Sequence, residues 1–119
     1  MQQTSLEPVP FQHVRISDGF WKRRIDINRE VTARVCIEQC EITHRIDNFR
    51  VAAGRKPGKF EGIYYNDSDI YKVLEGIAYM LMDRADPSLE KTADEIIDDI
   101  CAAQQEDGYL YTFYTLNTP

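Results

Sequence analysis

The most regular pattern of apolar positions in the chain lies between residues 67 and 83. Apolar residues recur there at helical spacing along one side: Ile70, Val73, Leu74, Ile77, Ala78 and Leu81. Other large side chains fill much of the opposite side: Tyr71, Tyr79, Met80 and Met82. The pattern predicts a helix over residues 70–82, capped by Asp67 or Ser68 and apolar on nearly every side. Because such a helix must be enclosed by protein, we expect further helices or another chain to cover it.

The next segment predicts a helix with only one apolar side. Asp86 can cap this helix, and Pro87 suits its first position because the missing N–H has no helical partner there. One stripe consists of Leu89, Ala93, Ile96, Ile97, Ile100 and Gln104. The other consists of Glu90, Lys91, Asp94, Glu95, Asp98 and Asp99. We predict that this helix lies outside the first, with the acidic run 94–99 as a solvated face rather than a catalytic carboxylate pair.

These two helices are expected to run antiparallel, because only the short turn 84–86 joins them. The start of the first helix and the end of the second then meet at one end of the hairpin. After Gln105 the chain turns at Asp107-Gly108, and residues 109–116 are predicted to be extended and β-prone. Aromatic residues flank that end: Phe60, Tyr64, Tyr65, Tyr71, Tyr109, Tyr111, Phe113 and Tyr114. Polar motifs that meet among aromatic residues predict a binding rim.

The N-terminal half of the chain has a weaker pattern. Residues 1–16 are predicted to be an extended lead-in, followed by a helix that runs to about Thr43. Trp21, in the first turn of that helix, is predicted to be a core anchor. Residues 47–62 are predicted to be a loop, since four residues interrupt any period: Gly54, Pro57, Gly58 and Gly62. No linker is seen, so residues 1–119 are predicted to be one segment without an internal domain boundary.

The composition excludes two classes of partner. The 119 residues carry a net charge of −6 and scattered basic side chains, which fit neither nucleic acid nor an anionic lipid surface. No apolar run approaches the roughly 20 residues that a membrane span needs. The N-terminus lacks the charged and apolar regions of a signal peptide, so we expect a cytoplasmic protein if Met1 is the native start.

Cysteine and histidine form no recognisable metal site. Three cysteines without a signal peptide, Cys36, Cys40 and Cys101, favour free thiols in a reducing compartment. Cys36 and Cys40 share one helix face, but structural zinc needs four ligands, and His13 and His44 add no ligand spacing. We therefore expect no metal in this chain. His44 is a weaker candidate for the rim, against a packing or solvent-facing role.

Several motifs run in order along nearly the whole chain: residues 18–24, 48–54, 60–62, 67–75, 86–90, 93–95 and 102–110. The strongest reads Asp67-Ser68-Asp69-Ile70-Tyr71-Lys72-Val73-Leu74-Glu75. In this order the motifs resemble the N-terminal part of the glycoside hydrolase family 127 enzymes, whose founding activity is β-L-arabinofuranosidase. The resemblance implies an all-α fold, namely the first helices of an (α/α)₆ barrel that is incomplete in this chain. It agrees with an enclosed helix followed by a one-sided one.

The resemblance also implies a chemistry. Family members carry out retaining glycoside hydrolysis with a cysteine nucleophile held near a zinc ion and a glutamate as acid/base. In the family these residues lie downstream, and Cys36, Cys40 and Cys101 match none of them, so no catalytic residue is assigned here. We therefore predict the N-terminal portion of a glycoside hydrolase that acts on L-arabinofuranosides or related plant sugars. We expect it to be inactive alone, with zinc only in the full-length enzyme.

The substrate-binding residues that the resemblance carries over lie at the predicted rim: Asp67, Asp69, Gln105, Asp107 and Tyr109. Carboxylates and amides there could bond sugar hydroxyls, and Tyr109 or Tyr111 could stack on a sugar face. The alternative is that Asp67 and Asp69 cap their helix and that Asp107-Gly108 only makes a turn.

Two rival functions stay open. A non-catalytic helical module would bind a partner or carbohydrate and would use its uncovered helix to form a homodimer. Alternatively, a second polypeptide would complete the barrel.

Overall fold

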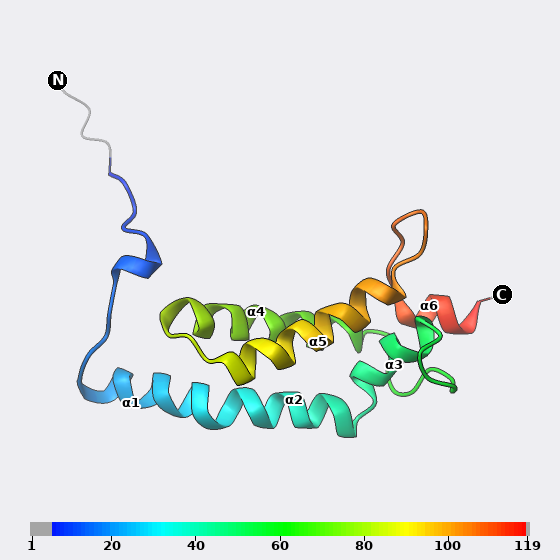
Figure 1. Ribbon diagram of the computed structural model, residues 1–119, viewed down its shortest axis with the longest axis horizontal. Helices are drawn as coiled ribbons and strands as arrows, with labels where there is room; N and C mark the ends of the chain where they lie inside the picture. Colours follow the sequence, from blue (N-terminus) through cyan, green and yellow to red (C-terminus); the bar gives the residue numbers. More distant parts are fainter. Residues whose placement is uncertain (1–5, 119) are drawn as a thin grey trace.

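The computed structural model describes residues 6–118, and all regular elements in that range are helical (Figure 1). In chain order they are η1 (Phe11–His13), α1 (Gly19–Ile27), η2 (Asn28–Thr32), α2 (Ala33–Ile42), α3 (Arg45–Ala52), α4 (Asp67–Asp83), α5 (Pro87–Ala103) and α6 (Thr112–Asn117). The prediction of an all-α chain is confirmed. No helix within residues 6–118 has the length and apolarity to cross a membrane.

The predicted lead-in is only partly described. Residues 1–5 lie outside the described range, and from residue 6 to the start of α1 the chain is irregular apart from the single 3₁₀ turn η1. In that turn, Phe11 packs edge to face on Tyr79 of α4, with ring centroids 5.9 Å apart. The N-terminal arm is thereby attached to the end of α4 that lies away from the predicted rim (Figure 1).

The segments α1, η2 and α2 form one continuous helix, as predicted for the stretch that ends near Thr43. In the wide π-helical turn η2, the N–H of Ala33 donates to the carbonyl of Asn28. Arg29 lies in this turn and is only 4% exposed. Its guanidinium donates to the carbonyl of Met80 at 2.6 Å and also to that of Arg84. A cation is favourable at the C-terminal end of a helix, so Arg29 joins the long helix to α4.

The helices α4 and α5 form the predicted antiparallel hairpin, which packs on the long helix (Figure 1). The side chain of Asp86 accepts a hydrogen bond from the N–H of Leu89 at 3.0 Å, which confirms the predicted cap of α5. The start of α4 differs from the prediction. Asn66 occupies its N-cap position, and the side chains of Asp67 and Ser68 bond elsewhere.

Two groups of buried side chains form the core between these helices. The first consists of Cys40, Ile46, Phe49, Ile70, Ile96 and Ala103. The second consists of Ala33, Ile77, Leu89 and Ala93. The helices α2, α3, α4 and α5 all contribute to them, so burial of apolar surface fixes how these four elements pack.

The loop prediction for residues 47–62 is wrong as far as residue 52, because α3 occupies that stretch. Ile46 and Phe49 lie one helical turn apart and are fully buried, and α3 packs chiefly on α5. Burial of these two large side chains favours a helix here. The first glycine downstream only ends it, since Gly54 follows α3 with a φ of 68°.

The prediction of an extended segment over residues 109–116 is wrong from residue 112 onward, where α6 begins. Thr112 is almost fully buried, and its N–H donates to the carboxylate of Asp67 at 2.8 Å. A carboxylate at the first turn of a helix satisfies an N–H that has no helical partner. This cap from a distant residue outweighs the β propensity of the aromatic and β-branched residues.

Two single-residue predictions are also wrong. Trp21 is 65% exposed, and its ring packs on that of Phe20 with centroids 5.1 Å apart, because no described element covers this side of α1. Asp99 does not face solvent with the rest of the acidic run, since it is only 8% exposed. Arg50 and Arg55 donate to its two carboxylate oxygens at 2.7 and 2.8 Å, which makes burial of this charge possible.

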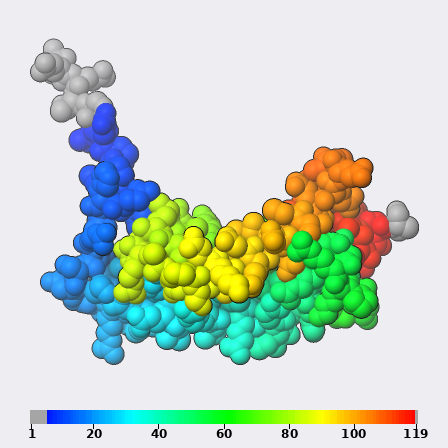
Figure 2. All heavy atoms as spheres, viewed as in Figure 1, coloured from blue at the N-terminus to red at the C-terminus, as the bar shows by residue number. Residues whose placement is uncertain are grey.

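The molecule is flat and leaves apolar surface open. Its extents are 61 × 41 × 24 Å. The N-terminal arm and the segment after α5 project from the same side of the helical layer, as Figures 1 and 2 show. On α4, Tyr71, Tyr79 and Met82 are 39%, 54% and 45% exposed. The chain by itself therefore encloses only part of the helix that is apolar on nearly every side.

Candidate functional site

The structure brings the start of α4 and the segment after α5 together at one end of the hairpin. Asp67 opens α4, Thr112 opens α6, and 45 residues separate them in the sequence. The carboxylate of Asp67 accepts the Thr112 N–H at 2.8 Å and the Thr112 hydroxyl at 2.6 Å. The predicted meeting of the start of one helix with the segment that follows the other is confirmed.

Asp67 points into the protein rather than into solvent. It is 5% exposed, and each of its two carboxylate oxygens is bonded to Thr112. A sugar hydroxyl would have to displace these buried bonds to reach it. Of the two alternatives, the geometry favours capping, although Asp67 caps α6 and not the helix that it opens.

Asp69 is directed toward α3. Its Oδ2 accepts a hydrogen bond from Nε of Arg45 at 2.9 Å, and its Oδ1 lies 3.4 Å from Nζ of Lys72. The hydrogen bond from Arg45 is the largest influence on Asp69 and, together with Lys72, lowers its pKa below the usual range despite partial burial. Asp69 is therefore a charged and paired carboxylate at neutral pH.

Gln105, Asp107 and Tyr109 lie in the projecting turn after α5. The N–H of Gln105 donates to the carbonyl of Tyr109 at 2.9 Å, and the N–H of Tyr109 donates to Oδ1 of Asp107 at 2.9 Å. Gly108 completes the turn with a φ of 88°, a region that favours glycine. The side-chain amide of Gln105 donates to the hydroxyl of Thr115 at 3.0 Å and ties the turn to α6. The predicted turn is confirmed, while sugar binding by these residues stays a prediction.

Six aromatic residues from the segments that precede α4 and follow the projecting turn form a continuous aromatic cluster at this end: Phe60, Tyr64, Tyr65, Tyr111, Phe113 and Tyr114. Phe113 lies at its centre, and its ring centroid is 5.2 Å from that of Phe60 and 6.0 Å from that of Tyr111. The predicted crowding of aromatic side chains at the rim is confirmed for these six residues.

Two further aromatic residues of the predicted rim lie outside the aromatic cluster. Tyr71 packs against Phe49, with ring centroids 6.0 Å apart. Burial, with a smaller effect of the Asp67 charge, raises the pKa of Tyr71 to about 12. Tyr109 is 44% exposed on the projecting turn.

A shallow, open hollow of about 530 Å³ lies beside the projecting turn. It is lined by Ala52, Ala53, Ala102, Ala103, Gln104, Gln105, Glu106, Asp107 and Thr115. Small apolar side chains from α3 and α5 meet amide, carboxylate and hydroxyl groups here. Such a lining suits a small polar ligand.

The loop before α4 is held by buried amides that the sequence analysis missed. Asn48 of α3 donates to the carbonyl of Glu61 at 3.0 Å and accepts the Glu61 N–H at 2.9 Å. Asn66 donates to the same carbonyl at 3.1 Å, while its Oδ1 has no hydrogen-bond partner in the described part of the chain. The sequence offered one signal for these bonds: Asn48 is a polar residue next to Phe49, which is buried, so its amide needs a hydrogen-bond partner.

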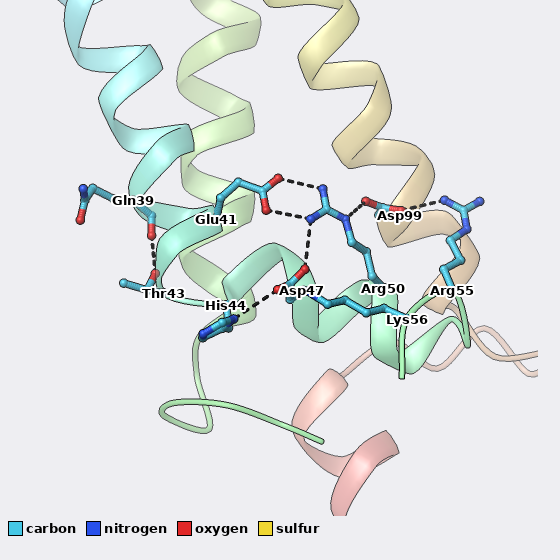
Figure 3. Close-up of polar contacts among 9 residues, drawn as sticks. All are labelled: Gln39, Glu41, Thr43, His44, Asp47, Arg50, Arg55, Lys56 and Asp99. Carbon is cyan, nitrogen blue, oxygen red and sulfur yellow. Dashed lines mark hydrogen bonds and ion pairs between the residues drawn. The ribbon is translucent and has the colours of Figure 1, made fainter. Parts of the chain in front are cut away.

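A cluster of ion pairs joins α2, α3 and α5 (Figure 3). Arg50 of α3 lies at its centre and donates to both oxygens of Glu41 at 2.7 and 2.8 Å and to Asp99 at 2.7 Å. Asp47 accepts hydrogen bonds from Arg50 at 3.1 Å and from Lys56 at 2.6 Å. The bonds to Glu41 above all raise the pKa of Arg50, so it is a permanent cation that holds three elements together.

His44 belongs to this ion-pair cluster and not to the rim (Figure 3). It occupies the N-cap position of α3 in the left-handed conformation, with a φ of 59°, and its Nδ1 lies 3.2 Å from a carboxylate oxygen of Asp47. The placement favours a structural role for this histidine.

The described residues do not fit a zinc site. Within residues 6–118, no three His, Cys, Asp or Glu side chains are grouped so that they could hold a metal ion. Cys36, Cys40 and Cys101 are free thiols. Burial raises the pKa of the Cys40 thiol, which disfavours the thiolate that binds metals.

Residues 13–119 match the family model described as β-L-arabinofuranosidase, GH127 catalytic domain. The non-reducing end β-L-arabinofuranosidase of Bifidobacterium longum subsp. longum is 35% identical over 125 residues, which cover 89% of this chain and 19% of that protein. The crystal structure of a GH127 β-L-arabinofuranosidase from Geobacillus stearothermophilus T6 matches with a TM-score of 0.87 and 43% identity, over 90% of this chain and 18% of that one. Another GH127 β-arabinofuranosidase structure matches with a TM-score of 0.83 and 41% identity, over 92% of this chain and 17% of that one.

This chain thus spans less than a fifth of the length of the relatives that it matches. GH127 proteins have an (α/α)₆ barrel fold. The prediction that these helices are the first part of such a barrel is confirmed.

Proposed function

Since this chain belongs to the GH127 β-L-arabinofuranosidase family, we propose that it is the N-terminal portion of a glycoside hydrolase that acts on L-arabinofuranosides or related plant sugars. The match over residues 13–119 carries the proposal, because it takes in almost the whole chain. Two solved structures of family members match at more than 40% identity and support it. The names of these relatives supply the sugar and the reaction.

Three features of the rim, at the end of the hairpin where α4 begins, support the proposal that it binds sugar. It combines an exposed aromatic cluster, a hollow with polar walls and a turn that internal hydrogen bonds hold in place. Aromatic surfaces with a few placed polar groups are typical of small-molecule sites. We therefore propose that Gln105, Asp107 and Tyr109, which are exposed, contribute to substrate binding in the complete barrel.

We also propose that this portion is inactive alone. The family resemblance implies a cysteine nucleophile near zinc and a glutamate acid/base, and a nearby metal ion would supply the thiolate form of that cysteine at neutral pH. Within residues 6–118, no three His, Cys, Asp or Glu side chains are grouped so that they could hold that metal ion. The contribution of this chain is accordingly to bind, to orient and to form one sector of the barrel.

A chimeric enzyme tests the proposed function. Residues 13–119 would replace the matching segment of the Geobacillus stearothermophilus T6 enzyme, and hydrolysis of 4-nitrophenyl β-L-arabinofuranoside would be measured. We expect the chimera to hydrolyse this substrate, because its rim would be supplied by a family member with the same fold. The isolated 119-residue chain should show no turnover above background.

Two controls complete this experiment. The parent enzyme without the segment should be inactive, and near-UV circular dichroism should show that the chimera is folded. A folded but inactive chimera would contradict the proposed function. Turnover by the isolated chain would contradict only its inactivity.

We further propose that additional helices, in the same polypeptide or in another chain, cover the open apolar faces of this one. Exposed apolar side chains on the long helix support this: Phe20, Trp21, Ile27, Val31, Val35 and Ile42. Light scattering on the isolated chain tests it, and association or aggregation is the expected result. A discrete dimer would favour the rival function, a homodimeric helical module. A stable, well-folded monomer would contradict the need for a cover.

A further inference from the structure

Four tyrosines of the aromatic cluster keep their hydroxyl groups free. Tyr64, Tyr111 and Tyr114 pack on Phe113, and Tyr65 packs on Tyr64, so that the four tyrosines form a tyrosine platform. Tyr64, Tyr65 and Tyr114 are 59%, 50% and 51% exposed, and Tyr111 is half-buried. Within residues 6–118, none of the four hydroxyls is hydrogen-bonded to protein, whereas the groups around them are. Each hydroxyl is therefore an available donor and acceptor.

Three carboxylates of the rim are occupied by contrast. Asp67 is bonded twice to Thr112, and Asp69 is paired with Arg45. One oxygen of Asp107 accepts the N–H of its own turn. Around the aromatic rings, the surface that this end offers to a ligand consists of ring faces and uncharged hydroxyls, while the exposed carboxylate of Glu106 lies on the projecting turn.

The tyrosine platform is fixed on both sides. Buried Asp67 holds Thr112, which lies between Tyr111 and Phe113 in the sequence. On the other side, Tyr64 packs edge to face on its neighbour Tyr65 with ring centroids 5.0 Å apart. Tyrosine brings a large contact area with few rotatable bonds, so a platform packed in this way loses little entropy when it binds.

We propose that the tyrosine platform is the surface that contacts the substrate, that it takes a neutral saccharide, and that Asp67 is a positioning residue that holds Tyr111 through Thr112. This inference rests on the proposed function. It assigns the contacts with the sugar to tyrosine side chains, whereas the sequence analysis assigned them in part to Asp67 and Asp69. Aromatic faces suit the C–H faces of a sugar, and phenol hydroxyls suit its hydroxyl groups.

The protonation state of Tyr111 agrees with this role. Loss of solvent and the charge of nearby Asp67 both raise the pKa of Tyr111 above its usual value. Its hydroxyl accordingly stays protonated at neutral pH and can donate to a sugar oxygen.

A titration of the chimera described above with L-arabinose, the sugar that hydrolysis releases and that is therefore not turned over, tests the proposal by NMR. We expect saturable shifts of the platform ring signals and of the Thr112 amide, with a Kd in the millimolar range. Tyr111→Phe and Tyr114→Phe each remove one hydroxyl and keep the ring, and each should raise the Kd about threefold to tenfold. Tyr79→Phe is the matched control, because Tyr79 is 54% exposed at the other end of α4 and should not affect the Kd.

Two further experiments complete the test. The first asks whether Asp67 positions Tyr111 or contacts the sugar itself, and the second compares a neutral sugar with a charged one. Asp67→Ala should raise the Kd and shift the ring signals of Tyr111, whereas Asp67→Asn keeps an acceptor for Thr112 and should restore most of the affinity. Methyl β-D-glucuronide, a charged sugar, should bind at least about tenfold more weakly than the neutral probe, because its carboxylate would lose water without gaining a cation.

The proposal is overturned if the phenylalanine variants at positions 111 and 114 bind like the wild type, or if no saturable binding is seen. Equal affinity for the charged and the neutral sugar would overturn the claim that the platform prefers a neutral saccharide. Failure of Asp67→Asn to restore binding would overturn the positioning role. Binding is read here without turnover, so a failed titration and an inactive chimera are separate results.

Discussion

Gly62 has a backbone conformation and a neighbour that both exclude a side chain. Its φ is +96°, and a Cβ at this position would lie 2.2 Å from Nδ2 of Asn66. Asn66 is buried and bonded to Glu61, so it cannot move aside without loss of that bond.

We therefore expect Gly62→Ala to lower the free energy of unfolding by about 1–3 kcal/mol, as measured by urea denaturation. Gly76→Ala is the control. Gly76 lies inside α4 with open space around its Cβ position, and alanine there should stabilise the helix by about 0.5–1 kcal/mol. Equal effects of the two substitutions would show that the loop before α4 adapts easily.

Asp67 is the second residue whose environment predicts a measurable effect. Asp67→Ala would leave the buried N–H and hydroxyl of Thr112 without a partner, at a cost of about 1–3 kcal/mol in unfolding free energy. Asp107→Ala, in the exposed turn, should cost less than about 1 kcal/mol. Urea denaturation of both variants compares a buried carboxylate with an exposed one, and similar losses would contradict the capping of α6.

For single residues, the sequence predicted a role correctly where the hydrogen-bond partner is close in the sequence, and failed where the partner is distant. Asp86 was identified correctly as a cap because its partner, the N–H of Leu89, is three residues away. Asp67 and Asp99 have partners 45 and 49 residues away, and no local pattern shows such a distance. Their roles depend on which elements pack together, so they became visible only in the structure.

Among the elements, α5 shows how much one cap contributes. Removal of the Asp86 side chain by Asp86→Ala should lower the unfolding free energy by about 1 kcal/mol, because the Leu89 N–H would lose its acceptor. Asp18 also occupies an N-cap position, that of α1, but makes no side-chain cap bond. Asp18→Ala should therefore change the thermal midpoint little, and an equal loss for both variants would contradict this assignment.

The helices that the sequence predicted well are those with long apolar stripes. The helices α4 and α5 have 17 residues each, enough for a period to show. The two missed helices, α3 and α6, have 8 and 6 residues. Such short helices are marginal by themselves and form here because Phe49 is buried and because Asp67 caps Thr112.

At the scale of the whole molecule, the ion-pair cluster links stability to pH. Burial alone would raise the pKa of Asp47, but hydrogen bonds from Lys56, His44 and Arg50 outweigh it and lower the pKa to about 2 from a usual 3.8. A lowered carboxyl pKa contributes stability that is complete well above 3.8 and is lost as the pH falls through about 2.

We therefore expect the thermal midpoint to fall between about pH 4 and pH 2, with a contribution from Asp47 on the order of 1–2 kcal/mol. Asp47→Asn should be less stable at pH 7 and should lose less than the wild type over that interval. Asp98→Asn, which changes an exposed carboxylate of α5, should follow the wild-type curve. Parallel curves for the wild type and Asp47→Asn would contradict the link.

The sequence predicted the overall architecture more completely than it predicted the candidate site. Ordered motifs and an enclosed helix beside a one-sided one indicated the barrel correctly. The burial of Asp67 and the availability of the phenols could not be predicted, since both depend on how α6 docks on the start of α4. Trp21 was misplaced for a related reason, because no element within residues 6–118 packs on that side of α1.

The π-helical turn η2 gives the long helix one place where its length can change. A wide turn accommodates one residue more than a regular turn, and the helix axis continues on both sides of it. Deletion of exposed Glu30 within η2 should therefore leave a regular helix, with Ala33 and Cys40 still facing the core. Deletion of exposed Glu38, in the regular α2, would instead rotate Cys40 away by about 100°. Comparison of the two thermal midpoints should show that this segment tolerates the loss of a residue in η2 better than in α2.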